Sequence, residues 1–372
     1  MNEAGVVNLF TVLRLLLIGG IFLILPRVTR KGLLFGAYVG EEFAEGDGAR
    51  RLVRHWYFSC VVLIIVSLVI GLGISLAGWP IAGNLICTAI LLVAGLGLYL
   101  RMYYTAREMA PPAASRQAET AVAPLEQGEP KGTGLAKLAL GICILASLAS
   151  AVYATVSYEA MPQRVPIHFG LSGEPDQWAA KSYVSVMLVP SLNLVISPFL
   201  ALMALLTANA KRSVRGGSGG RSAEAQLAFR AAVANLLSGT ALFICLLLSF
   251  LSVQTIRVGL SEIGSLGTGT LWIAAAMVIF LLAALIRIIT KYGQGGALIE
   301  EGSVEAPLTN GLADNTRWVW GVFYVNKDDP SILVEKRFGI GYTINFGNWI
   351  AVAIVFTPLV MILGLIALAM IM

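Results

Sequence analysis

Apolar residues form eight long runs along this chain, and polar residues are confined to the segments between them. Each run holds about 20 residues or more, which at about 1.5 Å rise per residue lets a helix cross the hydrocarbon core of a bilayer. The pattern predicts an all-α multi-pass membrane bundle of about eight transmembrane helices, with a small cytoplasmic segment that contains a β-hairpin. The runs are residues 6–25, 57–77, 81–100, 135–156, 183–206, 231–256, 267–289 and 349–371.

The distribution of basic residues predicts which side of the membrane each connector faces. Of the 26 Lys and Arg residues, all except Arg14, Arg164, Lys181 and Arg257 lie in or beside alternate connectors. An excess of Lys and Arg marks the cytoplasmic side of a membrane protein. We therefore expect both termini to face out of the cell.

The composition agrees with a membrane environment and argues against nucleic-acid binding. The chain is 57% hydrophobic and 13% charged, with a mean hydropathy of +0.80, whereas soluble domains carry about 25% charged residues. The net charge of +5 comes from basic residues that are spread over the inner connectors, where they set orientation and contact anionic lipid. The four cysteines lie far apart inside apolar runs and form no CxxC site, so we predict no cofactor and no metal.

The connectors divide the chain into four expected regions. In the first, a Pro- and Ala-rich stretch cannot bury a core and predicts a disordered linker, while Trp56 and Tyr57 are expected to anchor at the membrane interface. The regions are 1–133 with three helices, inner loop 26–56 and linker 101–133; 134–289 with outer loop 157–182; the cytoplasmic β-hairpin module 290–348; and the last transmembrane helix 349–372.

The module 290–348 has the strongest strand propensity in the chain. Residues 318–325 are aromatic and β-branched, residues 327–330 (KDDP) interrupt them, and residues 331–335 continue with similar character. This pattern predicts that 318–325 and 331–335 pair as one hairpin. A two-stranded hairpin is marginal in water, so we expect the module to lean on the membrane surface or on inner helix ends. Segment 318–346 is a candidate site for a cytoplasmic protein partner.

The outer loop 157–182 is the one extracellular connector long enough to hold a site. Pro166 forces an extended conformation before it, and the sequence SGEPD at 172–176 favours a turn. A hairpin would bring together side chains suited to ligand contact. Three interpretations stay open: a purely structural turn, a peptide or ligand contact, and a divalent metal site. The candidate ligand-binding residues are His168, Glu174, Asp176 and Trp178.

Arg14 is the charge nearest the middle of an apolar run. Intramembrane charges are costly and usually face the bundle interior. No Asp or Glu lies in any of the eight runs, so backbone carbonyls or the amides of Asn84, Asn193 or Asn235 are its expected partners. Snorkelling of Arg14 toward the headgroups is the alternative.

The fifth apolar run combines two prolines with a polar amide. Pro190 and Pro198 each remove a backbone donor, which frees the carbonyls of Val186 and Leu194 beside Asn193. Free carbonyls and an amide can form a polar pocket in lipid; a packing kink is the simpler interpretation. Together with Arg14, Pro190 and Asn193 are the intramembrane polar candidates.

Two sets of motifs resemble known families. The sequences VPIHF at 165–169 and GEPDQW at 173–178 resemble the signature loop of a bacterial membrane family, domain of unknown function 1648, which SdpI-like toxin-immunity proteins carry. The sequences WGVFY at 320–324, DDP at 328–330 and KRFGIG at 336–341 are similar to a second module, domain of unknown function 5808. The resemblance implies a bacterial plasma-membrane protein with an immunity or sensing role, and it carries over no catalytic residues.

These observations favour a receptor or immunity-type membrane protein that contacts a peptide or envelope-active ligand through its outer loop. The alternative is a small-solute or lipid transporter with a path near Arg14 and the fifth run. An enzyme is not expected, because no nucleophile–base pair or two-histidine metal motif is apparent in the sequence.

Overall fold

The structure is a computed structural model of the whole chain. It describes residues 3–27, 29, 32–110, 132–170, 172–210, 219–293, 296, 298–299, 314–337 and 341–371. Most of the predicted linker lies outside the described residues; its beginning is helical, because the helix that precedes it continues to Met109.

Eight helices in the described part of the chain are long and apolar enough to cross a membrane, as the sequence predicts. Several extend beyond the apolar runs into the inner connectors, because charged residues continue the helix outside the hydrocarbon. The helices are α1 (Glu3–Ile24), α3 (Asp47–Leu76), α4 (Pro80–Met109), α5 (Thr133–Ser157), α6 (Tyr183–Ala208), α7 (Gly219–Gly259), α8 (Gly269–Lys291) and α9 (Trp349–Ile371).

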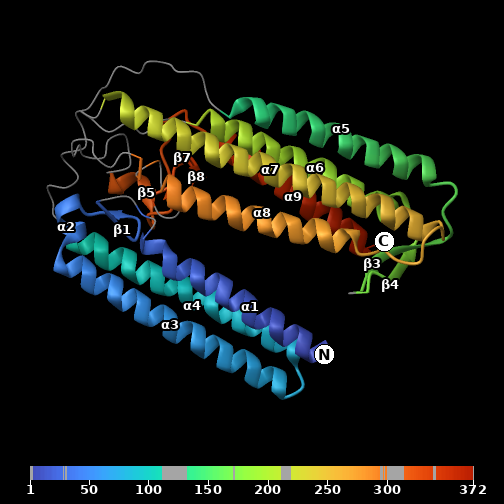
Figure 1. Cartoon of the computed structure of the whole chain (residues 1–372), viewed down its shortest axis with the longest axis horizontal. Coiled ribbons are helices and arrows are strands. Elements are labelled where there is room, and N and C mark those ends of the chain that lie inside the picture. The colour runs from blue at the N-terminus through green and yellow to red at the C-terminus, as the bar shows by residue number, and fades with distance from the viewer. Residues whose placement is uncertain are drawn as a thin grey trace.

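The helices form two groups (Figure 1). In the first, α1 packs on the antiparallel pair α3–α4; in the second, α5, α6 and α7 pack on one another, α8 on α7 and α9 on α6. Small residues make the close contacts, as is usual between helices in lipid. A Cβ on Gly83 would lie 2.4 Å from the Gly71 carbonyl oxygen. Between α5, α6 and α7 the core residues are Ala139, Cys143, Ala201, Ala241 and Cys245.

The two ends of the molecule carry different connectors. Figure 1 shows both termini, the tight α3–α4 turn and the hairpin of β3 (Arg164–Phe169) and β4 (Pro175–Ala180) at one end. The opposite end carries the first inner loop and the C-terminal module. The structure therefore confirms the predicted alternation of connectors. Which end faces out of the cell remains a prediction from the basic residues.

The strands of the inner end pair differently from the prediction. Residues 318–325 do not form one strand, but two that fold back on each other, β5 (Trp318–Val319) and β6 (Phe323–Tyr324). Trp320 and Gly321 have φ values of 55° and 69°, the left-handed conformation of a tight hairpin turn. The expected pairing with 331–335 is thus wrong: β7 (Leu333–Glu335) pairs with β8 (Tyr342–Ile344) instead. Propensity identified the strand-forming residues but not this reversal at Gly321.

The C-terminal module packs against the first inner loop, which contains β1 (Leu33–Leu34), β2 (Ala37–Tyr38) and α2 (Glu41–Glu45). Their shared core contains Leu33, Tyr38, Trp318, Tyr324 and Val334. The backbones meet at two glycines with positive φ, where a Cβ on Gly36 would lie 2.9 Å from the Gly321 carbonyl oxygen. The predicted contact of the module with inner helix ends is confirmed, since the Tyr99 hydroxyl on α4 donates to the Trp320 carbonyl at 2.8 Å.

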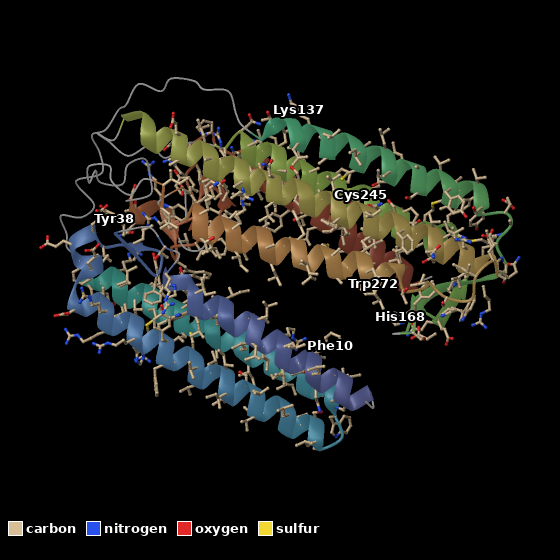
Figure 2. All side chains as sticks on the ribbon, viewed as in Figure 1. Phe10, Tyr38, Lys137, His168, Cys245 and Trp272 are labelled. Atoms are coloured by element: carbon tan, nitrogen blue, oxygen red, sulfur yellow. The ribbon has the colours of Figure 1, made fainter. Side chains whose placement is uncertain are left out.

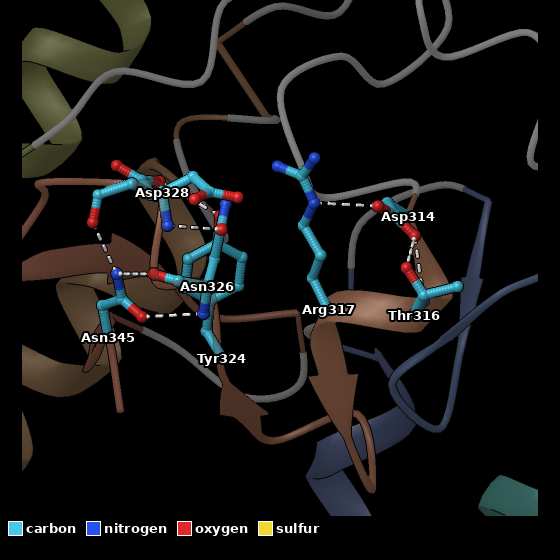
Figure 3. A network of polar contacts seen from close by, with 8 residues as sticks. Asp314, Thr316, Arg317, Tyr324, Asn326, Asp328 and Asn345 are labelled. Carbon is cyan, nitrogen blue, oxygen red and sulfur yellow. Dashed lines mark hydrogen bonds and ion pairs between the residues drawn. The ribbon is translucent and has the colours of Figure 1, made fainter. Parts of the chain in front are cut away.

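A buried amide holds the module together internally (Figure 3). Asn345 is fully buried, and its Nδ2 donates to the carbonyls of Asn326 and Asp329 at 2.7 and 2.8 Å. Its Oδ1 accepts from the backbone N–H groups of Asn326 and Gly347 at 3.0 and 2.9 Å. One side chain thus satisfies four backbone groups that short strands leave without partners.

Candidate functional site

The outer hairpin brings the predicted loop residues to the end of the molecule opposite the C-terminal module. In Figure 2, His168 lies at this end and Tyr38 at the other. β3 and β4 are antiparallel, with Pro166 opposite Trp178 and Phe169 opposite Pro175. The register shifts on either side of His168, which re-aims that side chain, as β-bulges do.

His168 and Asp176 form the polar centre of the hairpin. His168 Nδ1 lies 2.6 Å from Asp176 Oδ1, and the two side chains are 59% and 49% exposed. An exposed pair of this kind contributes at most about 1 kcal/mol to stability. Both side chains are thus accessible at the surface of the hairpin, and their pairing adds little to the stability of the fold.

The other two candidates of the loop stand apart from this pair. Glu174 is exposed, and its carboxylate forms no hydrogen bond or ion pair with the described residues. Trp178 is 41% exposed on β4. No group of three or more His, Cys, Asp or Glu among the described residues is arranged to hold a metal ion. The metal interpretation of the loop therefore has no geometric support there.

The membrane side of the hairpin is well anchored. Met161 and Val165 are buried against Val186 of α6 and Ile256 of α7. Lys181 Nζ donates to the carbonyls of Glu159 and Met161 at 3.2 and 3.0 Å. β3 therefore rests on the helix ends, while β4 faces away from them. Among the described residues no third strand pairs with β4, so one edge of this sheet is free.

A cavity of about 80 Å³ lies beneath β3, between α6 and α7. Pro166, Ile167 and Phe169 line it from above, and Pro190 and Ser252 from below. Ser252 is 1% exposed, and its hydroxyl has no hydrogen-bond partner among the described residues. Pro190, predicted as an intramembrane candidate, thus belongs to the outer site, and α6 continues as a helix through it.

Asn193 lies one helical turn deeper in α6 and is fully buried. Its Nδ2 donates to Ser249 Oγ at 2.9 Å, and its Oδ1 accepts from Ser197 Oγ at 2.6 Å. The bond to Ser249 links α6 to α7, and the bond from Ser197 lies within α6. The amide is therefore engaged in helix packing and does not face the cavity.

Arg14 lies in the other helix group. Its Nη2 donates to Asn84 Oδ1 at 2.6 Å, to the Asn84 carbonyl at 3.1 Å and to Thr88 Oγ1. Asn84 in turn donates to Thr11 Oγ1 at 2.9 Å. Of the three amides considered for Arg14, the structure selects Asn84. Arg14 and Asn193 therefore belong to separate helix groups.

Arg337 is a buried charge that the sequence analysis did not single out. Its guanidinium is fully buried, lies 5.1 Å from the Trp318 ring, and donates to Asn315 Oδ1 at 2.7 Å and to the Gly36 carbonyl at 3.4 Å. Burial lowers the pKa of Arg337 to about 9, against the opposing effect of Tyr103 and Asp314. Asn315 also exchanges two hydrogen bonds with the Tyr38 backbone. Arg337 follows the end of β7 by two positions, and this place beside a predicted strand was the sequence signal that could have identified it.

Asp314 opens the short helix η3 (Asn315–Arg317) beside this cluster (Figure 3). Desolvation opposes its ionisation, but hydrogen bonds from Thr316 and the charge of Arg317 hold its pKa below the usual value. Arg317 Nε lies 2.9 Å from Asp314 Oδ2. A carboxyl with a lowered pKa stabilises the fold above its ordinary pKa, and this contribution is lost as the pH falls through the lowered value.

Comparison with family models matches two segments of the chain. Residues 145–194 match "Domain of unknown function (DUF1648)", and residues 327–352 match "Family of unknown function (DUF5808)". Both resemblances found in the sequence are therefore confirmed. The first match covers the β3–β4 hairpin with parts of α5 and α6, and the second covers β7 and β8 of the C-terminal module and the first residues of α9. Comparison with curated proteins and with solved structures gives no match.

Proposed function

We propose that this multi-pass membrane protein is a receptor or immunity-type protein of the bacterial plasma membrane that binds a peptide on its β3–β4 hairpin. The observation that carries the proposal is the free edge of β4 in the described chain. An edge strand presents unpaired N–H and C=O groups to an additional strand, and adding a strand is a common mode of peptide recognition. The peptide would bind in an extended conformation.

Side chains around this edge supply specificity. The exposed His168–Asp176 pair can exchange its mutual contact for hydrogen bonds to a peptide, and the exposed Trp178 ring offers an apolar surface. Aromatic side chains are frequent anchors in binding sites. The exposed carboxylate of Glu174 adds a negative charge, which favours a cationic peptide, as many envelope-active peptides are.

The cavity beneath β3 connects this surface to the helices. Ser252 at its floor lies on α7, and Phe229 near the other end of the same helix has its ring centroid 6.2 Å from that of Tyr342 in the C-terminal module. A ligand that presses β3 into the cavity would therefore act on a helix that contacts the inner module. This arrangement supports a sensing role.

The principal test is the replacement of His168, Glu174 and Asp176 by Ala together in cells exposed to cationic envelope-active peptides. We expect the variant to lose the tolerance that the intact protein confers, while its amount in the membrane stays the same. Tolerance equal to that of cells with the intact protein would contradict the proposal.

A second pair of variants tests the cavity without touching the polar residues. Val189→Phe on α6 places a larger side chain in the cavity, and Leu194→Phe introduces the same side chain at a residue of α6 that is 40% exposed and does not line it. We expect weaker binding of a labelled cationic peptide to the first variant only. Equal effects of both variants would exclude the cavity from binding.

Labelling in intact cells tests the orientation on which the proposal depends. The four native cysteines are all buried, so cysteines introduced at exposed positions give little background. We expect Ser172→Cys to react with a membrane-impermeant thiol reagent and Lys327→Cys to react only after lysis. The reverse pattern would place the hairpin inside the cell and remove it as an outer receptor surface.

A further inference from the structure

An apolar cavity of about 290 Å³ lies at the inner end of the first helix group. Phe22 and Leu25 at the end of α1, and Leu96 and Leu100 in the second half of α4, form its membrane side. The β5–β6 hairpin closes it from the module side with Trp320 and two neighbouring residues, Val322 and Phe323. The cavity therefore lies at the depth where acyl chains of one leaflet meet their headgroups.

The polar side-chain atoms of Trp56 and Tyr99, which line this cavity, are engaged within the protein. Trp56 was expected at the interface but is 1% exposed, and its Nε1 donates to the Phe22 carbonyl at 3.0 Å. The Tyr99 hydroxyl donates to the Trp320 carbonyl. What remains for a ligand is almost purely hydrocarbon surface. A polar ligand would lose its hydration there without gaining hydrogen bonds.

The cavity is open to the bilayer rather than sealed inside the protein. Leu92 and Leu96, which line it, are 48% and 53% exposed. Trp320 and Phe323 are also exposed, at 40% and 37%. Large apolar side chains exposed at this depth are suited to contact with lipid. An acyl chain can therefore enter from the side.

Three arginines lie close in sequence to residues that line the cavity. Arg27 follows the lining residue Leu25 by two positions, Arg54 precedes Trp56 by two, and Arg101 follows Leu100 directly. Arg54 and Arg101 are exposed, and the Arg27 guanidinium lies 5.7 Å from the Tyr57 ring. Among the described residues, none of these three arginines forms an ion pair with a carboxylate. The charge complements an anionic headgroup.

We infer that this cavity is a binding site for an anionic phospholipid of the leaflet at the module end. One acyl chain lies between α1, α4 and the β5–β6 hairpin, and the phosphate faces the arginines Arg27, Arg54 and Arg101. The lipid contacts both the first helix group and the C-terminal module, so its binding stabilises their docked arrangement. This inference does not depend on the proposed peptide receptor.

Photo-crosslinking in vesicles tests the site. The full-length protein is reconstituted with phosphatidylglycerol that carries a diazirine on one acyl chain, or with phosphatidylcholine labelled in the same way. We expect the anionic probe to label peptides that contain residues 92–100 and 320–323 several times more strongly than the neutral probe. Equal labelling by both probes, or labelling spread evenly over α8 and α9, would overturn the inference.

Matched variants separate the cavity from the general lipid contact of α4. Leu96→Trp fills the cavity, whereas Val93→Trp introduces the same side chain at a residue that is 71% exposed and does not line it. We expect the first variant alone to abolish labelling at 92–100. Should Leu96→Trp fail to fold, Leu96→Phe is the milder filling variant. Unchanged labelling in a folded filling variant would contradict the site.

Charge variants test the headgroup. Replacing Arg27, Arg54 and Arg101 by Gln, one at a time, should lower the preference for the anionic probe by about fivefold for each arginine, the equivalent of ~1 kcal/mol. Arg50→Gln, on the same loop but six positions before Trp56, is the comparison variant. A similar loss for Arg50→Gln would mean a diffuse surface charge effect and would overturn the assigned arginines.

Discussion

The outer hairpin and the inner module are built from the same element, a short antiparallel strand pair, but they treat polar groups in opposite ways. At the outer end the His168–Asp176 pair is about half exposed. At the inner end Arg337 and Asn345 are fully buried and bonded to backbone carbonyls. Exposed groups remain available to a ligand, whereas buried ones are committed to the fold. The difference supports the proposed recognition role of the β3–β4 hairpin and a structural role for the C-terminal module.

The position of the inner module explains why its polar groups are buried. It contacts the first helix group through Gly36 and Tyr99, and the second through the ring of Tyr342 against Phe229. No pair of helices, one from each group, makes an extensive contact in the described chain. The module therefore joins the two groups, and its core must exclude water to remain rigid.

The largest effect on stability is expected where the module meets the first inner loop. Gly36→Val places a Cβ 2.8 Å from the Tyr99 hydroxyl and strains a backbone with φ of +81°. We expect a loss of about 3–5 kcal/mol in the free energy of unfolding, from overpacking and backbone strain together. Denaturation in mixed micelles measures it.

Two controls separate these causes. Gly341 has a φ of +99°, similar to that of Gly36, whereas Gly97 lies within α4. A Cβ added at either position would meet nothing within 4 Å, so Gly341→Ala and Gly97→Ala are suitable controls. Gly341→Ala should show the strain alone, and Gly97→Ala no loss. A Gly36→Val protein as stable as the Gly97→Ala protein would mean that the glycine contact does not hold the module.

Asn345→Ala should have the next largest effect. It leaves two buried backbone donors and two carbonyls without the side chain that satisfies them, which costs about 2–3 kcal/mol. Asn348→Ala removes two exposed bonds, one to the Pro330 carbonyl and one from the Ile350 N–H at the start of α9, and should cost about 1 kcal/mol. Equal losses for both variants would show that burial of Asn345 is unimportant. The measurement is the same denaturation.

Arg14→Ala is expected to have a moderate effect that is confined to the first helix group. Loss of its bonds to Asn84 and Thr88 should cost about 1 kcal/mol, the usual size for polar contacts between membrane helices. Arg51→Ala, at an exposed position on α3, is the control and should change the unfolding midpoint little. Loss of solute flux in vesicles on Arg14→Ala would instead favour the transporter alternative.

His168→Gln should have the smallest effect on stability and the largest on recognition. Because the His168–Asp176 pair is exposed, we expect a change in the free energy of unfolding below about 0.5 kcal/mol. Peptide tolerance should nevertheless fall. If His168→Gln lowers the free energy of unfolding as much as Asn345→Ala does, the two regions do not differ in this respect and the His168–Asp176 pair has a structural role.

Much of the fold followed from local pattern. The apolar runs gave the eight helices, Pro166 and the SGEPD turn gave the outer hairpin, and strand propensity identified the residues of the inner module. The pairing of those inner strands could not be predicted in the same way. A reversal at Trp320 and Gly321 depends on Gly36 and Tyr99 on distant elements, which no local signal records.

The candidate site likewise has features that local sequence predicts and features that depend on tertiary packing. Local spacing placed His168 near Asp176, because a turn of few residues leaves little choice. Local spacing could not predict that Glu174 stands apart from this pair or that Pro190 lines the cavity beneath β3. It also could not predict that Arg14 bonds to Asn84 rather than to Asn193. Those outcomes depend on which helices pack together.

The sequence by itself determined that this protein crosses a membrane, how its connectors alternate and where its outer hairpin lies, since hydrophobic length and turn chemistry act over neighbouring residues. Only the tertiary structure decided that the helices form two groups joined by the module, and that a buried Arg337 and an apolar cavity lie at their junction. Packing between segments some 300 residues apart sets these features, and no short-range pattern encodes it.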